Sequence, residues 1–400
     1  MEGIVLETAI DMLLANTKNI IDFEDIDLFE AVGRVSAADV NARFDNPPFD
    51  RSPLDGYALN SAFTKDATAS NPAKFKIVGE ECAGDFYTGK LNDGEALRIM
   101  TGAAMPAGSD CVIRQEDVTV IDDELFVPYE LKHHENYCFS GEDIKSGNLL
   151  IKRGQVLNAS RIAVLASQGF TSVKVNRKPS IAIASTGDEL LMPGTELTAG
   201  KIYNSNLYFL AGRLKELGFD PKIIGILPDD ANKAAAVINE YKDNTDLFIT
   251  TGGVSVGKKD IIHDVVKLVG QRIFWRVLMK PGAPVVSYTA GNMLGIALSG
   301  NPFAAYATFE LLVRPVLEKL SGRSDIIYRR CEAELINDFP KESRGRRFIR
   351  ARYENGCVTL PDQHASGSLF SAADCNALID IPAGTGKLTA GTKVNVVLLY

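Results

Sequence analysis

Residues 179–325 alternate between continuous apolar runs and helix-like segments, and this alternation constrains the fold more than any other feature. The runs SIAIAST, PKIIGIL and DLFITTGG are each followed by a segment such as SNLYFLAGRLKELG, and the runs APVVSYT and NMLGIALSG precede a last helix. Continuous apolar runs fit strands that are buried on both faces, and strand–helix repetition builds parallel units. We therefore predict a three-layer α/β domain with a mostly parallel sheet over residues 179–325.

The segments on either side of this domain predict three further parts. Residues 1–46 have apolar residues every three to four positions, and residues 141–178 contain another helix near 159–168, so together they predict a helical, mixed base domain. Residues 47–140 hold short β-type runs between glycine turns, which is typical of a small antiparallel barrel or sandwich inserted into the base. Residues 326–400 return to short strands and predict a C-terminal β domain. The fold class is thus multidomain, α/β and β.

Charge and cysteine usage exclude several classes of protein. The formal net charge is −8 and the pI is near 5.3, whereas a general nucleic-acid binder needs a basic face. No run approaches the roughly 18 apolar residues of a membrane helix, and the start MEGIVLETAIDMLL lacks the basic stretch of a secretory signal. The six cysteines are scattered without paired spacing, as in reduced thiols. We expect a cytoplasmic protein with no nucleic-acid and no membrane partner.

Polar residues follow four of the predicted strands at the point where each strand ends. They are STGDE at 185–189, PDD at 228–230, TTGGVSVG at 250–257 and LSGNP at 298–302. In an open parallel sheet, ligands bind beyond the carboxyl ends of the strands. These four segments are therefore expected to share one rim and one ligand site.

Glycines and acids on this rim indicate phosphate and metal chemistry. Gly252, Gly253 and Gly257 allow backbone N–H groups to approach an anion, and the helix that begins near Asp260 adds a positive dipole end. Four acids share the rim: Asp188, Glu189, Asp229 and Asp260. They would repel an anion unless a cation intervenes, and Mg²⁺ takes oxygen ligands from carboxylates and phosphates together. The alternative is that each acid caps a helix or lies in a solvated loop.

Cations come from two other segments. Lys280 precedes a Pro-Gly turn, and SRGRRFIRARY at 343–353 holds five arginines. In a strand, Arg350 and Arg352 share one face. Such a concentration in a chain of net charge −8 favours an oxyanion role for at least one arginine, and a solvated basic face is the alternative.

Motifs along the whole chain resemble one family. NPPFDRSPLDGYAL, TGAAMPAGSDCVIRQED, STGDELLMPG with GKIYNSN, TTGGVSVGKKD, VLMKPGAPV and LSGNPFAAYATFELLVRPVL occur in order. They are similar to motifs of the molybdopterin molybdenumtransferases, which include bacterial MoeA and the E domain of gephyrin. The resemblance implies a four-part protomer with a molybdopterin-binding α/β domain, and an elongated homodimer whose site lies in a cleft between protomers.

The resemblance also implies a reaction. Adenylated molybdopterin and molybdate bind as substrates together with Mg²⁺, molybdenum is inserted into the dithiolene, and AMP is released. A molybdopterin adenylyltransferase or cofactor-accepting proteins are the partners that such a reaction suggests.

Roles follow for residues that match the family motifs. Asp55 and Thr101 resemble cleft residues from the inserted domain. Catalytic roles are expected for Asp55, Glu189, Asp229, Asp260 and Lys280. Molybdate is expected at Lys280, Arg350 and Ser366, and Mg²⁺ at Asp229 and Asp260. Substrate binding is expected at Thr101, Thr186, Asp188, Gly252, Gly253, Ser255, Ser299, Asn301 and Pro302.

Three positions depart from the family pattern. Ser299 stands where the family usually has proline, Ala304 where it often has serine, and Cys138 where it commonly has arginine. Loss of arginine removes a permanent cation, and loss of proline loosens a turn. Two alternatives to the insertase therefore stay open. One is a non-catalytic or divergent paralogue that binds molybdopterin or a protein partner, and the other is a homologue that inserts tungsten.

Overall fold

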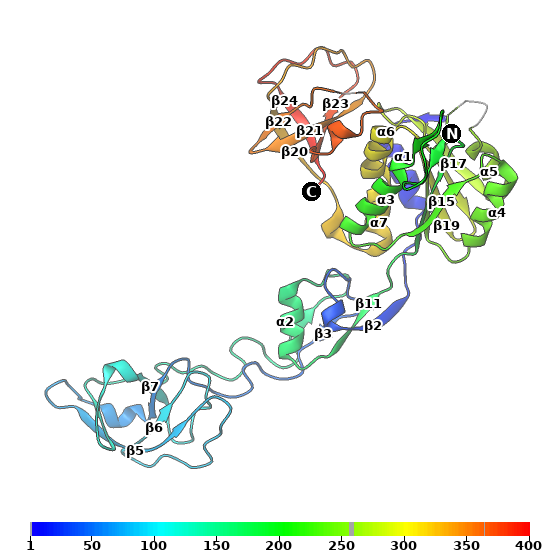
Figure 1. The fold of residues 1–400 in the computed structure, drawn as a ribbon. Helices are drawn as coiled ribbons and strands as arrows, with labels where there is room; N and C mark the ends of the chain where they lie inside the picture. Colours follow the sequence, from blue (N-terminus) through cyan, green and yellow to red (C-terminus); the bar gives the residue numbers. More distant parts are fainter. Residues whose placement is uncertain (1, 256–259, 364) are drawn as a thin grey trace.

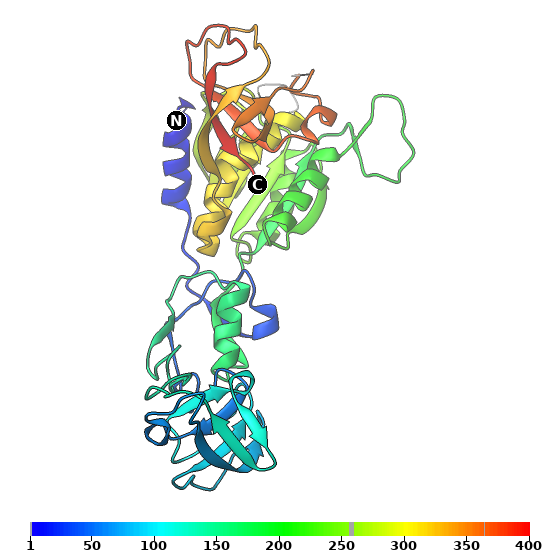
Figure 2. The same ribbon diagram turned by 90° about the vertical axis from the view of Figure 1, so that its left-hand side faces the viewer.

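The chain forms an elongated molecule of four parts (Figures 1 and 2). The structure is a computed structural model that describes residues 2–255, 260–363 and 365–400. The α/β domain and a C-terminal barrel lie together at one end, a small base domain lies in the middle, and an inserted β domain forms the other end (Figure 1). The predicted fold class is confirmed.

A seven-stranded sheet of order β1-β17-β18-β19-β16-β12-β15 forms the centre of the α/β domain. Its ladders are parallel except for β17–β18 and β18–β19, which are antiparallel. The sheet is therefore mostly parallel, as predicted. Its strands are β1 (Glu2–Ile4), β12 (Ile181–Thr186), β15 (Lys222–Leu227), β16 (Leu247–Thr251), β17 (Gln271–Val277), β18 (Val286–Ala290) and β19 (Met293–Leu298).

Helices cover both faces of this sheet. Ile183 of β12 packs in the same core as Leu210, whereas its neighbour Ala184 packs on the opposite face with Ala234. This alternation explains why β12 is apolar throughout, since both of its faces are buried. The helices on the first face are α1 (Leu6–Asn16), α3 (Ser205–Glu216), α6 (Pro302–Thr308) and α7 (Arg314–Ser321), and those on the second are α4 (Ala231–Tyr241) and α5 (Ile262–Val269).

The start of the chain belongs to the α/β domain, not to the base domain as the sequence led us to expect. β1 pairs in parallel with β17, and the buried side chains of α1, Leu6, Ala9 and Leu13, lie in the α/β core. The helical pattern alone does not tell which core an amphipathic helix joins, because that depends on long-range packing.

The base domain contains less helix than the sequence predicts. The segment after α1 forms β2 (Phe23–Asp27), which pairs antiparallel with β11 (Ser172–Asn176), so a helix over this segment was a wrong prediction. Gly33 has φ +77°, a left-handed conformation that interrupts a helix. The rest of the domain is α2 (Ala159–Ser167) with a short ladder of β3 (Val40–Asn41) and β10 (Leu149–Ile151).

The inserted domain is a six-stranded sheet of order β7-β4-β6-β5-β9-β8. The sequence predicted antiparallel strands, but β5 and β6 run parallel. Gly56 is required in β4, because a Cβ there would lie 1.9 Å from the Ile113 carbonyl oxygen. The strands are β4 (Gly56–Leu59), β5 (Ala73–Glu81), β6 (Glu95–Ile99), β7 (Cys111–Arg114), β8 (Thr119–Ile121) and β9 (Glu124–Val127).

The C-terminal domain is a closed barrel of order β20-β22-β21-β23-β24. Ile349 and Ala351 of β21 point into the barrel core, while Phe348 on the other face packs into the α/β core. The strands are β20 (Arg329–Leu335), β21 (Arg347–Glu354), β22 (Cys357–Thr359), β23 (Ala377–Ile381) and β24 (Lys393–Leu398). In the parts of the chain that the structure describes, no helix has the length and apolar character needed to cross a membrane.

A buried ion network joins the helices of the α/β domain to the end of the barrel. Glu310 lies in a π-helical turn between α6 and α7, and its side chain is fully buried. Arg213 donates from Nε to Glu310 Oε1 at 2.5 Å, and Arg314 donates from Nη1 to Oε2 at 2.9 Å. Both arginines also donate to the backbone carbonyl of Leu399. The network therefore ties three segments together.

We predict that Glu310→Ala destabilises the protein by about 3–5 kcal/mol, because it leaves the buried Arg314 without a carboxylate and the buried Arg213 with only the half-exposed Glu216. Urea unfolding followed by circular dichroism measures the change. The matched control is Glu216→Ala, which removes a half-exposed partner of the same Arg213 and should cost at most about 1 kcal/mol. Equal losses in the two variants would contradict the assigned role of the network.

Candidate active site

The carboxyl ends of four strands meet at one cavity of about 320 Å³, which we call the rim cavity. The strands are β12, β15, β16 and β19. The sequence-predicted residues that line it are Thr186, Glu189, Asp229, Gly252, Gly253, Ser255, Asp260, Ser299 and Asn301. Asp188 and Pro302 lie beside these residues in the chain but not among the lining residues. Gly257, the third glycine that we expected to approach an anion, lies outside the described residues.

The two glycines of the rim turn are required by space and conformation. Gly252 has φ +91°, and a Cβ there would lie 2.4 Å from the Thr186 carbonyl oxygen. Gly253 has φ +67°, with a Cβ position 2.8 Å from Thr186 Oγ1. The Thr186 hydroxyl itself is buried and has no hydrogen-bond partner among the described residues. A buried hydroxyl without a partner leaves hydrogen-bonding capacity for a ligand.

The rim acids come from different strand ends. Asp229 Oδ2 accepts a hydrogen bond from the Asp188 backbone N–H at 3.0 Å, which fixes the turn after β12 against the turn after β15. Among the described residues, no group of three histidine, cysteine or acidic side chains is close enough to hold a metal ion alone. A site with one or two carboxylates suits Mg²⁺, which usually completes its shell with water and substrate phosphates. Asp229 and Asp260, which both line the cavity, supply carboxylates of that kind.

Sequence reasoning missed one polar residue of the rim cavity. Asn206 in α3 lines the cavity and donates from Nδ2 to the Gly300 carbonyl at 2.8 Å, which fixes the turn before α6. Asn204 caps the same helix by accepting from the Leu207 N–H at 3.2 Å. The run YNSN at 203–206, which spans the start of α3, was the available signal, because asparagine is favoured at helix starts.

A second cavity, of about 290 Å³, lies between α6 and the barrel, and we call it the basic pocket. Lys280, Arg350 and Ser366, which the sequence assigned to molybdate, all line it. Lys341, in a loop, and Arg347, the first residue of β21, also line it and were missed, because the sequence does not reveal which side chains share a cavity. No carboxylate is among its described lining residues. The basic pocket therefore has the opposite charge character to the rim cavity.

Arg350 is the buried cation of the basic pocket, with 1% of its surface exposed. Its guanidinium lies 3.8 Å from the centre of the Phe303 ring, and it donates to Ser371 Oγ at 2.8 Å and to the Ala365 carbonyl at 2.5 Å. Its Nε is buried without a partner in the described residues, and burial lowers the pKa of the group. A buried cation paired only with neutral groups favours an anion beside it.

The exposed neighbour of Arg350 behaves differently. Arg352 lies exposed on the same strand, with its Nε 3.6 Å from Glu354. The alternative prediction, a solvated basic face, is therefore wrong for the buried Arg350 and correct for the exposed Arg352.

The turn that carries Lys280 is fixed by the barrel. The Lys280 backbone N–H donates to the Arg346 carbonyl at 3.0 Å, and the Phe348 N–H donates to the Lys280 carbonyl at 2.8 Å. Gly282 has φ +92°, and a Cβ there would lie 2.4 Å from Thr308 Cγ2. The positive φ and the close approach to Thr308 explain why glycine stands at 282.

Asp55 and Thr101 lie far from both cavities, in the inserted domain at the opposite end of the molecule (Figure 1). Asp55 Oδ1 accepts from the Thr101 backbone N–H and from its hydroxyl, both at 2.7 Å. These hydrogen bonds hold the pKa of Asp55 below its ordinary value of 3.8, so the carboxylate stays ionised at neutral pH. Within one chain, the structure does not bring this pair to the rim.

The three departures from the family pattern lie in different surroundings. Ser299 lines the rim cavity, and its hydroxyl accepts from the Asn301 N–H at 3.3 Å. Ala304 is buried in α6. Cys138 exchanges two backbone hydrogen bonds with Arg51 and carries no disulfide.

The α/β domain, with its glycine- and acid-rich rim on a mostly parallel sheet, matches a known family of domains. Residues 182–319 match the family model described as a probable molybdopterin binding domain. Residues 4–169 match the MoeA N-terminal region, described as domains I and II, and residues 332–399 match the MoeA C-terminal region, domain IV.

Whole-chain comparisons agree with these matches. A molybdopterin molybdenumtransferase of Staphylococcus epidermidis is 36% identical over 380 residues, which cover 94% of this chain and 90% of that protein. A Staphylococcus aureus protein of the same name is 35% identical and covers 93% of this chain and 90% of its own length. The crystal structure of the molybdopterin biosynthesis moeA protein from Pyrococcus horikoshii superposes with a TM-score of 0.84 at 30% identity, covering 99% of this chain and all of that one.

The chain belongs to the MoeA family, the molybdopterin molybdenumtransferases, which are enzymes of molybdenum cofactor biosynthesis. The resemblance found in the sequence is confirmed, and so is the assignment of the chain to molybdenum cofactor biosynthesis.

Proposed function

We propose that this protein transfers molybdenum from molybdate to adenylated molybdopterin and releases AMP. The observation that carries the proposal is the adjacency of two cavities with opposite charge. Asn301 lines the rim cavity, and Phe303, two residues on, lines the basic pocket. The Phe303 N–H also donates to the Ser366 carbonyl at 3.0 Å. The rim cavity can therefore bind a substrate that carries phosphates and a metal ion, while the basic pocket beside it binds a separate oxyanion.

The rim cavity suits the phosphoanhydride of the adenylated pterin. Gly253 lines the cavity and the buried Thr186 hydroxyl is available as a donor, whereas the Gly252 N–H already donates to the Leu298 carbonyl at 3.0 Å. Asp229 and Asp260 would hold Mg²⁺, which, when bound, offsets the repulsion between carboxylates and phosphates and polarises the bond that breaks. Glu189 lines the same cavity and completes the acidic side of the site.

The basic pocket suits molybdate, a tetrahedral dianion. Arg350 offers a planar guanidinium, Lys280 a compact charge, and Ser366 a hydroxyl. The absence of a carboxylate among the described lining residues means that repulsion does not exclude the dianion. Burial strengthens the attraction, because fewer water molecules screen the charges.

A cytoplasmic homodimer would complete this site. Asp55 and Thr101 lie at the far end of the same chain, so only the inserted domain of a second copy can bring the ionised Asp55 to the rim (Figure 1). In such an arrangement Asp55 and Thr101 bind substrate across the cleft between copies. A molybdopterin adenylyltransferase and proteins that accept the cofactor are the partners that fit this place in the synthesis.

The direct test mixes the pure protein with adenylated molybdopterin, Mg²⁺ and molybdate. We predict that AMP appears only when molybdate and Mg²⁺ are both present, and that chelation of the metal stops its release. Chromatography of the nucleotide measures AMP. Pterin binding without AMP release would favour the non-catalytic paralogue, and AMP release with tungstate but not molybdate would favour the tungsten homologue.

We predict that Asp229→Asn lowers AMP release at least ~10²-fold, the effect expected when a directed electrostatic contact is lost. A matched control is Asp230→Asn, since Asp230 caps α4 by accepting from the Lys233 N–H at 2.9 Å and asparagine caps equally well. Unchanged turnover and unchanged Mg²⁺ dependence in Asp229→Asn would remove this residue from the metal site.

We predict that Arg350→Ala raises the molybdate concentration for half-maximal turnover ~10-fold or more, from about 1.5–3 kcal/mol for a hydrogen bond to a charged group. Affinity for the adenylated pterin should change much less. Arg352→Ala, an exposed arginine on the same strand, serves as the control. If the pterin binds worse while the molybdate dependence stays the same, Arg350 belongs to the pterin site instead.

A further inference from the structure

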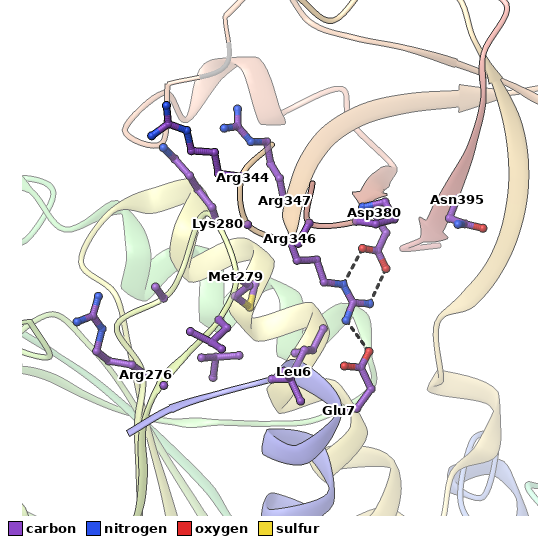
Figure 3. A pocket seen from close by; sticks show the side chains of 18 of the residues that line it. Leu6, Glu7, Arg276, Met279, Lys280, Arg344, Arg346, Arg347, Asp380 and Asn395 are labelled. Carbon is purple, nitrogen blue, oxygen red and sulfur yellow. Dashed lines mark hydrogen bonds and ion pairs between the residues drawn. The ribbon is translucent and has the colours of Figure 1, made fainter. Parts of the chain in front are cut away.

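A cavity of about 1160 Å³ opens beside the Lys280 turn, and we call it the outer groove (Figure 3). Its walls are the start of α1, the 276–283 segment and the 342–347 segment of the barrel. Of the residues that line this groove, the function proposed above uses only Lys280.

The outer groove and the basic pocket share two lining residues, Lys280 and Arg347. The two residues form a parallel β-bridge with each other. This bridged backbone, which we call the seam, therefore separates the two cavities. The side chains of Lys280 and Arg347 line both of them. An anion held at this seam on the groove side is adjacent to the pocket that contains Arg350.

Charge is divided unevenly within the groove. Arg346 is neutralised: it donates to both oxygens of Asp380, at 2.8 and 2.7 Å, and to Glu7 at 2.5 Å. Figure 3 draws these contacts as dashed lines that join Glu7, Arg346 and Asp380. Arg346 is thus a structural link between α1 and the barrel.

The other cations of the seam have no such partners. Lys280, Arg344 and Arg347 extend away from the Arg346–Asp380 pair (Figure 3), and in the described parts of the chain none of the three has an ion pair. Arg347 has a buried Nε without a partner, and its one side-chain hydrogen bond, at 3.5 Å, goes to the Glu342 backbone carbonyl. These three cations outnumber the one carboxylate that lines the groove beside them, Glu342, so this part of the groove attracts an oxyanion.

We propose that Lys280, Arg344 and Arg347 form an outer oxyanion site that captures molybdate from solvent and delivers it to the basic pocket. The inference rests on the proposed function, which makes a tetrahedral dianion the substrate. A chain with net charge −8 repels such a dianion at long range, so local cations are needed for fast association. The inner cation is almost inaccessible, since Arg350 is 1% exposed, whereas Lys280 and Arg344 are exposed.

The test uses Arg344, which lines the groove but not the basic pocket. Stopped-flow measurements on the full chain follow molybdate association over a series of ionic strengths. Arg344→Ala should lower the association rate constant about tenfold and flatten its dependence on salt, and Arg344→Glu should lower it further. In AMP release, the defect should appear in kcat/KM for molybdate and vanish as molybdate is raised. Arg344→Lys should restore most of the rate.

Two comparisons separate this inference from the proposed function. Arg352→Ala removes an exposed arginine that lines neither cavity and should leave association unchanged. In one outcome, Arg350→Ala weakens molybdate binding at equilibrium, while Arg344→Ala keeps the association rate constant of the unmodified protein. That outcome would overturn the outer site and leave the basic pocket supported. If neither variant alters molybdate binding, the basic pocket and the outer site are both wrong.

Discussion

The arrangement of the site depends on one backbone seam, where the Lys280 turn of the α/β domain pairs with the first residues of β21 in the barrel. Two hydrogen bonds form it, from Lys280 N–H to the Arg346 carbonyl at 3.0 Å and from Phe348 N–H to the Lys280 carbonyl at 2.8 Å. The seam fixes the register of β21, so that Phe348 and Arg350 face the α/β domain while the alternate residues fill the barrel. A shift by one residue would turn Arg350 into the barrel core, and the basic pocket would lose its buried cation.

Buried charge is used in two distinct ways around this seam. Glu310 lies between Arg213 and Arg314, and Asp380 pairs with Arg346, so these arginines have carboxylate partners and hold the barrel against the helices. Arg350, by contrast, is buried among carbonyls, a hydroxyl and the Phe303 ring, with no carboxylate partner in the described residues. A paired charge stabilises an interface only modestly, whereas an unpaired one favours a ligand of opposite sign. This difference is why we assign the anion to Arg350 rather than to Arg346.

The sequence predicted the rim well, because parallel strands necessarily bring their carboxyl ends to one edge and the polar residues followed those ends. It did not predict that β1 and α1 join the α/β domain, because the residue pattern of a short strand or an amphipathic helix does not specify which domain it packs against. The grouping of Lys280 with Arg350 and Ser366 came from family motifs, not from spacing. Asn206, Lys341 and Arg347 were missed, because their roles arise where segments distant in the chain come together.

The central claim, that the oxyanion binds at the buried Arg350 next to an acidic substrate cavity, is tested most directly by crystallography with tungstate as a heavy substitute for molybdate. Anomalous difference density collected at the tungsten edge locates the ion without reference to turnover. The account predicts one strong peak in the basic pocket, within hydrogen-bond reach of Arg350, Lys280 and Ser366, and its loss in Arg350→Ala crystals. A peak only in the rim cavity, or a pocket peak of equal strength in the variant, would contradict it.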